Sequence, residues 1–155
     1  MKLLEKFNPP SEAGKFGAIR KYDIHTGVDL YCEPNSVVYA LEDGIVIDVI
    51  DFTGKVAGSP WWNDTKVILI KGASGVIAYG EVKPLVRYNQ KVKADQKIGK
   101  VLTVLKKDKG LPMTMLHIEL YENNVTDVVE WKLNAKQPKG LLDPTDLLKK
   151  YGVLK

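Results

Sequence analysis

Three side chains in this sequence have the types and the spacing of a metal site. The two histidines of the chain are His25 and His117, and Asp29 follows His25 by four residues. Because side chains at even spacing lie on one side of an extended segment, His25 and Asp29 are expected to face the same way. Two imidazoles and one carboxylate that converge can hold zinc and leave a fourth position open to water. Zinc with such an open position acidifies the bound water or polarises a carbonyl group.

The segment around His117 alternates in the manner of a strand. One predicted face carries Met115, His117 and Glu119, and the other carries Leu116, Ile118 and Leu120. Glu119 has two interpretations, which the pattern leaves open. It could orient an imidazole from behind the metal, or it could be an ordinary hydrogen-bonded strand residue.

The elements that must position these residues are mostly β. Short apolar runs recur between turn signals, which favours an antiparallel sheet in a sandwich or barrel over a βαβ fold. The run Gly44–Phe52 is predicted to be buried on most of both faces. The predicted strands are Gly27–Cys32, Ser36–Leu41, Gly44–Phe52, Thr65–Lys71, Gly75–Val82, Ile98–Leu105 and Thr114–Tyr121.

One short helix is predicted near the C-terminus. Asp143 is suited to its N-cap, Pro144 to its first position and Gly152 to its end. Leu147, Leu148 and Tyr151 give this helix an apolar side. The expected fold is therefore mainly β, with a short C-terminal helix.

Length and composition indicate one globular domain over 1–155. The chain has 155 residues, a net charge of +4 and 45% hydrophobic residues. Within it, 22–121 is expected to form the β core and 122–155 an insertion followed by the helix. The single cysteine, Cys32, excludes an internal disulfide. Without a signal peptide or an apolar run of about 20 residues, we expect cytoplasmic synthesis and no membrane span.

The positive charge is concentrated between Lys83 and Lys109. This segment has nine basic and two acidic residues, so it could attract a polyanion such as an anionic wall polymer. Eight of the nine are lysines, whereas bidentate phosphate and base-edge recognition favours arginine. Nucleic acid is therefore not the expected partner.

Six segments, in order along the chain, together resemble the lysostaphin/LytM-type zinc endopeptidases. That family's pattern is roughly HxGxD, VxAxxDGxV, YxHL, VxxGqxIG and HLHFE. The resemblance implies a LytM-like, duplicated-hybrid-motif fold with an antiparallel β-sheet core and a zinc groove. It also implies zinc ligands at His25, Asp29 and His117 and a peptidoglycan peptide, or a similar wall polymer, as partner. The matching segments are 25–29, 38–46, 79–80, 92–99, 116–119 and 143–144.

Two positions depart from the family pattern. The family's catalytic histidines are the first histidine of the HxH pair and the histidine of YxHL, and here they are Met115 and Glu81. Methionine can neither take up a proton nor donate a hydrogen bond. We therefore expect hydrolysis to be weak or lost. The alternative is an active peptidoglycan endopeptidase in which Glu81 is the general base.

Two aromatic residues are candidates for ligand binding. Trp62, beside Trp61, could stack on sugar or peptide at the rim of a groove, or pack in a loop. Tyr79 resembles the groove tyrosine of the family, although a core-facing strand tyrosine is equally ordinary.

A non-enzymatic lipoyl-like or phosphotransfer-like β domain is a second alternative. Neither Lys55 nor Lys71 stands in the setting of a lipoyl lysine, and the carboxylate of Asp29 near His25 does not suit a phosphate carrier. A wall-directed protein without a signal peptide needs another route to the wall. A phage lysis or virion system, or a separate export route, would provide it.

Overall fold

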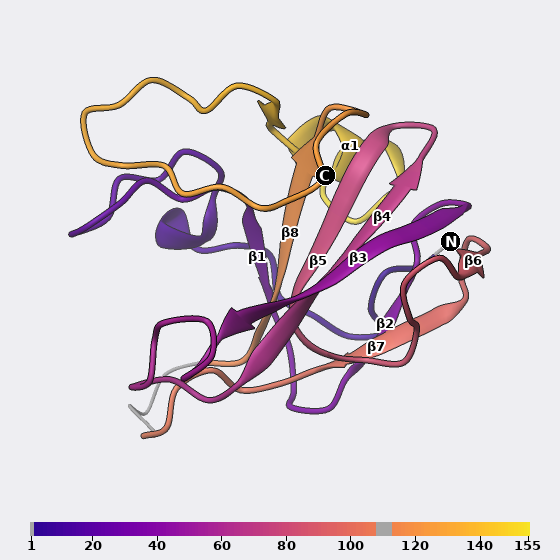
Figure 1. Ribbon diagram of the computed structural model, residues 1–155, viewed down its shortest axis with the longest axis horizontal. Coiled ribbons are helices and arrows are strands. Elements are labelled where there is room, and N and C mark those ends of the chain that lie inside the picture. The colour runs from indigo at the N-terminus through magenta and orange to yellow at the C-terminus, as the bar shows by residue number, and fades with distance from the viewer. Residues whose placement is uncertain (1, 108–112) are drawn as a thin grey trace.

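The computed structural model of the protein describes residues 2–107 and 113–155. In these residues one antiparallel sheet of nine strands follows the path β1-β8-β5-β4-β3-β6 (Figure 1). β2 pairs with β7, which also pairs with the end of β5, and β9 pairs with β8. The strands are β1 (Val28–Tyr31), β2 (Val37–Tyr39), β3 (Gly44–Thr53), β4 (Thr65–Gly72), β5 (Gly75–Pro84), β6 (Lys91–Val92), β7 (Lys97–Val101), β8 (Met115–Tyr121) and β9 (Leu141–Leu142).

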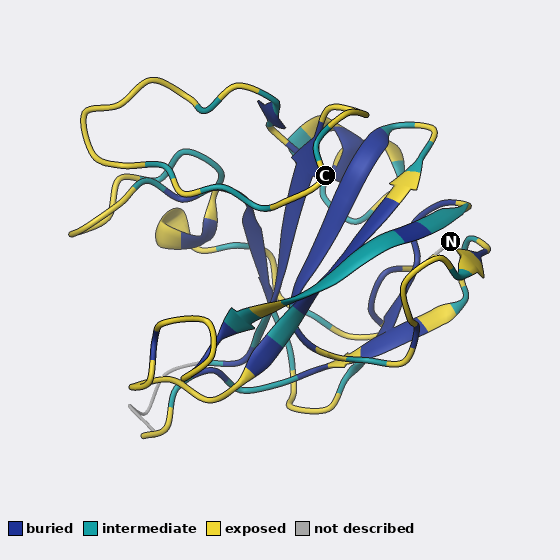
Figure 2. Ribbon diagram, viewed as in Figure 1, coloured by how far each residue is buried: buried dark blue, intermediate teal, exposed yellow. Residues whose placement is uncertain are grey.

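The most buried strands are β4, β5 and β8, in the middle of the sheet (Figure 2). Alternation sends their side chains into two apolar clusters. Ile77 and Ile118 lie in the larger cluster, whereas Val76 and Ala78 lie in the smaller. β3 is different: most of its residues are only partly buried. The prediction that this strand is buried on both faces is wrong, because β3 lies near the edge of the path with only the two-residue β6 beyond it.

The predicted strands are confirmed, with one shortened at its end. β7 stops at Val101 instead of continuing to Leu105. Beyond this point the chain leaves the sheet and makes isolated bridges, from Thr103 to Thr114 and from Leu105 to Trp62. The two-residue strands β6 and β9 were not predicted, because so short a strand has no periodicity to detect.

The predicted helix is present as α1 (Thr145–Lys150). A single 3-10 turn, η1 (Glu12–Gly14), lies near the start of the chain. Pro144 occupies the N-cap position, one residue earlier than expected. Asp143 still supplies the capping contact, because its Oδ1 accepts a hydrogen bond from the Thr145 amide at 2.9 Å. Gly152 ends the helix with a φ of 75°.

The C-terminal segment 122–155 shares its apolar core with the sheet. Leu147 and Leu148 of α1 are buried in the larger cluster. The Tyr151 hydroxyl donates to Glu42 Oε2 at 2.7 Å, which ties the end of the helix to the turn between β2 and β3. Among the described residues, no helix is long and apolar enough to span a membrane.

Candidate metal centre

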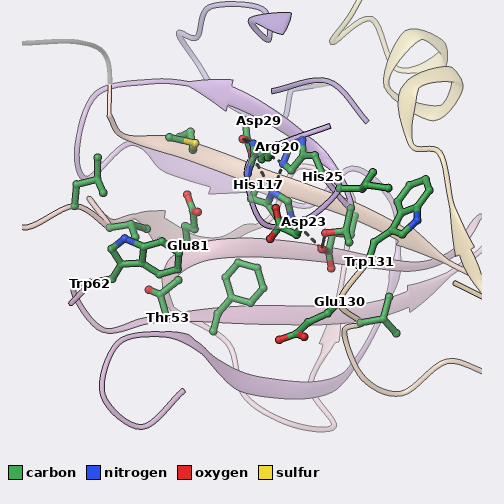
Figure 3. A pocket seen from close by; sticks show the side chains of 18 of the residues that line it. Arg20, Asp23, His25, Asp29, Thr53, Trp62, Glu81, His117, Glu130 and Trp131 are labelled. Carbon is green, nitrogen blue, oxygen red and sulfur yellow. Dashed lines mark hydrogen bonds and ion pairs between the residues drawn. The ribbon is translucent and has the colours of Figure 1, made fainter. Parts of the chain in front are cut away.

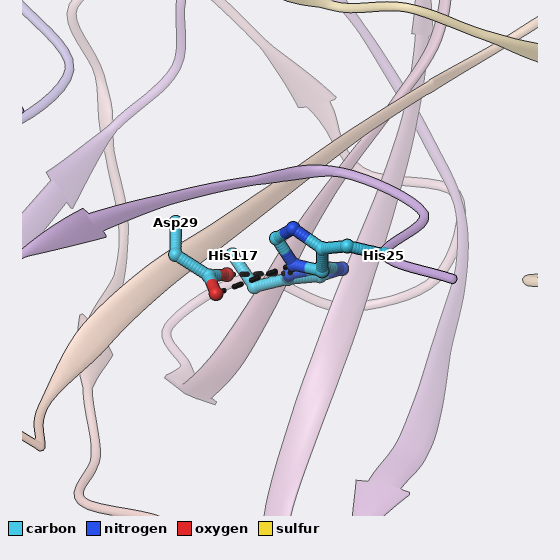
Figure 4. Close-up of side chains that lie close together, drawn as sticks. All are labelled: His25, Asp29 and His117. Carbon is cyan, nitrogen blue, oxygen red and sulfur yellow. Dashed lines mark hydrogen bonds and ion pairs between the residues drawn. The ribbon is translucent and has the colours of Figure 1, made fainter. Parts of the chain in front are cut away.

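Two neighbouring strands bring the predicted ligands together. In the β1–β8 ladder, Asp29 lies directly opposite His117. His117 Nδ1 is 2.8 Å from Asp29 Oδ1, and His25 Nε2 is 3.2 Å from both Asp29 Oδ2 and His117 Nδ1. All three side chains are buried and face one another (Figure 4). The convergence expected from the spacing of these residues is present in the structure.

Gly27 allows the segment between His25 and Asp29 to approach β8 closely. A Cβ at this position would lie 2.2 Å from the Ile118 carbonyl oxygen and 3.0 Å from His117 Cε1. Such contacts cannot be accommodated without moving the backbone of β8 or the imidazole. The glycine in the His-x-Gly-x-Asp spacing is therefore a packing requirement of the site.

The outer nitrogen of each imidazole has an oxygen partner. His25 Nδ1 is 3.0 Å from the Lys15 carbonyl oxygen, and His117 Nε2 is 2.9 Å from Glu119 Oε2. A carbonyl or carboxylate oxygen only accepts, so in neutral imidazoles these outer nitrogens carry the protons. The inner nitrogens then present lone pairs to the same point as the Asp29 carboxylate.

A proton on His117, whose pKa is raised, satisfies the contact with Asp29 in the metal-free protein, and a metal ion could take the place of that proton. The distances of 2.8 and 3.2 Å between the donor atoms are close to the edge of a zinc tetrahedron, about 3.4 Å for bonds of about 2.1 Å. Two imidazoles and a carboxylate, each imidazole held by an outer oxygen, are a donor set that zinc prefers. The residues present thus fit a zinc ion.

Arg20 braces the Asp29 carboxylate from the side. Its Nη2 donates to Asp29 Oδ2 at 3.0 Å and to the Ala13 carbonyl at 2.8 Å. Burial raises the pKa of Asp29, but the hydrogen bonds to His117 and His25 outweigh it and hold that pKa well below its usual value. Asp29 is therefore an anionic ligand throughout the neutral range.

Glu119 is buried and anchors His117 to the surrounding chain. Its carboxylate accepts hydrogen bonds from the hydroxyls of Thr26 and Tyr121, and Tyr121 in turn accepts from the Val129 amide at 3.1 Å. Burial raises the pKa of Glu119, but the contact with His117 outweighs burial, and the net pKa lies below its usual value. This carboxyl is therefore ionised. Burial lowers the pKa of His117, and the bonds to Asp29 and Glu119 raise it well above its usual value. Of the two interpretations of Glu119, the structure favours the orienting one.

A β-bulge directs Glu81 into the same cavity. The β4–β5 register shifts between Lys66 and Ile68, and Glu81 has a φ of 67°, a left-handed conformation unusual for a residue other than glycine. In regular alternation Glu81 would follow Tyr79 to the core face. The bulge instead places it in the lining of the cavity that also contains the three ligands (Figure 3).

One carboxyl oxygen of Glu81, Oε2, is buried without a hydrogen-bond partner among the described residues. Burial, and then the charge of Asp29, raise the pKa of Glu81 to about 8. A buried carboxyl oxygen without a partner, on a residue with a left-handed backbone conformation, is costly, and such features cluster at functional sites.

The cavity has a volume of about 400 Å³, and its lining includes Met115 and Trp62. Met115, His117 and Glu119 all line it, while Leu116, Ile118 and Leu120 lie in the apolar core, so the predicted faces of this strand are confirmed. Trp62 is 38% exposed and stands edge-on to the more exposed Trp61, with ring centroids 5.9 Å apart. Trp62 is thus positioned to contact a bound molecule.

Tyr79 does not line this cavity, and its predicted binding role is corrected. It is fully buried in the larger apolar cluster, and its hydroxyl accepts a hydrogen bond from the Leu41 amide at 3.1 Å. Strand alternation places Tyr79 on the core face together with Ile77, and the bulge that redirects Glu81 comes only after it.

Sequence reasoning missed several residues of the site. The Lys15 carbonyl carries no side-chain signal at all. Arg20 and Phe52, whose ring centroid lies 5.6 Å from that of His117, stand in segments that have no recognisable motif, and Thr26 was not singled out. Only Thr26 had a detectable signal, because it lies inside the His-x-Gly-x-Asp segment.

The described basic side chains of segment 83–109 do not line the cavity, although Val104 and Leu105 of the same segment do. Its residues 108 and 109 lie outside the described part of the chain. Lys83 and Lys100 lie opposite each other in the β5–β7 ladder, and both are exposed.

A comparison with protein families finds one match. The model of peptidase family M23 matches residues 23–128. Leukocyte cell-derived chemotaxin-2 of Bos taurus is 31% identical over 111 residues, and the mouse protein of that name is 30% identical. The alignment covers 68% of this chain and 66% of the bovine protein, so the chain spans just under two thirds of that relative.

Solved structures with the same fold include several peptidases. The catalytic domain of the prophage-encoded M23 protein EnpA from Enterococcus faecalis has a TM-score of 0.59 at 20% identity, covering 91% of both chains. The lysostaphin catalytic domain from Staphylococcus simulans has a TM-score of 0.55 at 20% identity, covering 92% of this chain and 88% of that one. A zinc-containing peptidase from Vibrio cholerae has a TM-score of 0.51 at 25% identity, covering 87% of this chain and 37% of that one.

Proposed function

The chain belongs to peptidase family M23, and from this premise we propose that it is a zinc-binding domain directed at cell-wall peptides in which hydrolysis is weak or lost. One observation carries the proposal. The protein has two histidines, and both point their inner nitrogens at Asp29. With both imidazoles used as ligands, none remains to transfer protons to a substrate.

His25, Asp29 and His117 would hold the zinc. When bound, the ion would polarise a peptide carbonyl or acidify a water molecule. Arg20 orients the Asp29 carboxylate, and Glu119 holds His117 in the tautomer whose Nδ1 is free to bind. These contacts support a well-ordered metal centre.

The groups that would assist hydrolysis are poorly matched to that task. The thioether of Met115 lines the cavity but offers no donor for the negative charge that develops on a carbonyl oxygen. In other hydrolases the loss of one such donor costs about 10²–10³ in rate. The proposed slow or absent hydrolysis follows from this substitution together with that of Glu81.

An active peptidase is the second candidate, and the carboxyl of Glu81 is the observation that favours it. A buried carboxyl with a raised pKa, in the same cavity as the ligands, has the properties of a general base. In this candidate Glu81 takes the proton of the attacking water, and substitution Glu81→Gln removes all activity.

The similar proteins are compatible with both candidates. EnpA is named as an M23 protein with a catalytic domain and lysostaphin as a peptidase, whereas the bovine relative is named as a chemotaxin. The prophage-encoded neighbour supports delivery to the wall by a phage, as part of this proposal. Nothing favours a lipoyl-like or phosphotransfer-like domain, because both histidines converge on a carboxylate.

The test combines metal analysis with a hydrolysis assay. Protein purified without chelator should contain about one zinc per chain, and incubation with purified peptidoglycan should release few or no new amine ends. Chelator should lower the melting temperature, because zinc bound only by the folded state stabilises it. A zinc-free preparation that gains no stability from added zinc would contradict the proposal. Rapid, chelator-sensitive release of amines that Glu81→Gln abolishes would establish the second candidate instead.

A matched pair of variants asks whether the missing imidazoles limit the rate. The double substitution Glu81→His with Met115→His should raise peptidoglycan hydrolysis, whereas Glu81→His with Met115→Leu should raise it less. Equal activity of the two variants would show that position 115 does not limit catalysis.

A further inference from the structure

The cavity of the metal centre is acidic although the chain as a whole is basic. Five carboxylates line it, against one cation, Arg20. In the whole chain, lysines and arginines outnumber acids by 23 to 19. The five acids are Asp23, Asp29, Glu81, Glu119 and Glu130.

Two of these carboxylates are already committed to the protein. Asp29 faces Arg20 and the two histidines, and Glu119 accepts hydrogen bonds from three side chains. The other three lack a partner. Within the described residues, the carboxylates of Asp23 and Glu130 make no hydrogen bond or ion pair, and Glu81 Oε2 is buried without one.

The three free carboxylates surround the cavity on different elements. Asp23 lies at the end of the short hairpin closed by the Ile19–Ile24 bridge, Glu81 lies on the bulge of β5, and Glu130 lies in the C-terminal segment. Figure 3 shows Asp23, Glu81 and Glu130 as separate groups around the pocket. Asp23 and Glu130 are exposed at the rim, whereas the Glu81 carboxyl is inside.

Apolar walls between these groups strengthen their effect. Phe52, Trp62 and Trp131 line the same cavity. Low-polarity walls reduce solvent screening and concentrate the field of the carboxylates in the cavity. A zinc ion offsets only part of this negative charge.

We infer that this pocket selects peptides that carry a free ammonium group, which Asp23, Glu81 and Glu130 receive beside the metal centre. The inference rests on the proposed function, because it names the class of cell-wall peptide that the site takes. Uncross-linked lysine-type wall peptides and the amino ends of cross-bridges have this chemistry. Acetylation of the amine removes the charge and the donors that the carboxylates need.

The test compares two forms of one insoluble probe. Lysine-type peptidoglycan, stripped of its anionic polymers, is used before and after acetylation of its free amines, and binding of the zinc-loaded full chain is measured by depletion. Acetylation should weaken binding about tenfold, as expected for the loss of two surface ion pairs, with Asp23 and Glu130. This preference should shrink between low and high salt.

Matched variants assign the preference to the rim of the pocket. The double substitution Asp23→Asn with Glu130→Gln should remove most of the difference between the two probes. The control, Glu33→Gln with Glu122→Gln, makes the same change in net charge at exposed acids that do not line the cavity. It should keep the full difference.

The outcomes separate this inference from the proposed function. Equal binding to both forms, or tighter binding to the acetylated form, overturns the ammonium preference while peptidoglycan binding itself stands. No binding to either form by protein that contains zinc overturns the proposed function and the inference with it. A preference that both double variants lose equally would show that net charge, and not this pocket, causes it.

Discussion

The two halves of the cavity differ in how well their polar side chains are provided with hydrogen-bond partners. In the ligand half, the inner nitrogens of His25 and His117 face Asp29, and both outer nitrogens contact an oxygen of the protein. In the other half, Glu81 has a buried oxygen without a partner and Met115 carries no titratable group. The candidate metal ligands and the candidate proton-transfer group of this cavity therefore lie on separate parts of the backbone.

The backbone explains why the halves differ in this way. The ligand half rests on the β1–β8 ladder, where cross-strand pairing sets Asp29 against His117. The Glu81 half rests on a β-bulge, where one extra residue redirects a side chain. The ladder fixes which residues face each other, whereas the bulge fixes where the Glu81 side chain points.

The largest effect is expected from His117→Ala. This substitution removes one of the three ligands and should abolish stoichiometric zinc binding, whereas Met115→Leu in the other half should leave binding unchanged. Zinc at about 1,000 times its dissociation constant stabilises a folded protein by about 4 kcal/mol, and His117→Ala should lose this increment. Chelator competition and thermal melts with and without zinc measure both quantities. Zinc-dependent stabilisation that survives in His117→Ala would show that this half of the cavity is not the metal centre.

The next effect is expected at Glu119, behind the ligands. Glu119→Ala leaves His117 Nε2 without its acceptor and removes the partner of the Thr26 and Tyr121 hydroxyls. Loss of such an outer partner typically weakens metal affinity about 10–100-fold. Glu122→Ala, an exposed acid just after β8, is the control and should not change the affinity. If the two variants had equal zinc affinities, Glu119 would have no orienting role.

Arg20→Ala should have a smaller effect on the same half. The guanidinium is partly exposed, so solvent screens its attraction for Asp29. We expect a loss of zinc affinity of about tenfold, at the lower end of effects from outer partners. Lys21→Ala removes a neighbouring cation that does not contact Asp29 and serves as the control. An unchanged zinc affinity in Arg20→Ala would show that the histidines alone hold Asp29 in place for the metal.

The smallest effect concerns the pH dependence of the metal-free protein. Burial and the charge of Asp29 raise the pKa of Glu81 to about 8, against the opposing influence of His117 and Arg20. In the folded state Glu81 therefore keeps a proton that the unfolded chain releases, so its contribution to stability falls as the pH rises from about 5 to 8. In chelator, the melting temperature of the wild type should fall more over this range than that of Glu81→Gln. Parallel profiles of the two proteins would show that Glu81 is already ionised in the fold.

Much of the fold was predictable because its signals are local. Alternation along 114–121 separates Leu116 and Ile118 from His117, and the structure keeps that division between core and cavity. The turn and cap residues near 143–152 mark the helix to within one residue. The burial of β3 was mispredicted, because the place of a strand in the sheet order is not written in its own residues.

By itself, the sequence determined which residue types were available for a metal centre, that the chain has only two histidines, and that imidazoles are missing at positions 81 and 115. Only the tertiary structure decided what surrounds them. The Lys15 carbonyl, Arg20 and the acids at 23 and 130 come from segments far apart in the chain, and their contacts depend on backbone paths that no local pattern encodes. The same holds for Tyr79 and Glu81, two residues apart, which the bulge sends to opposite environments, one to the core and the other to the cavity.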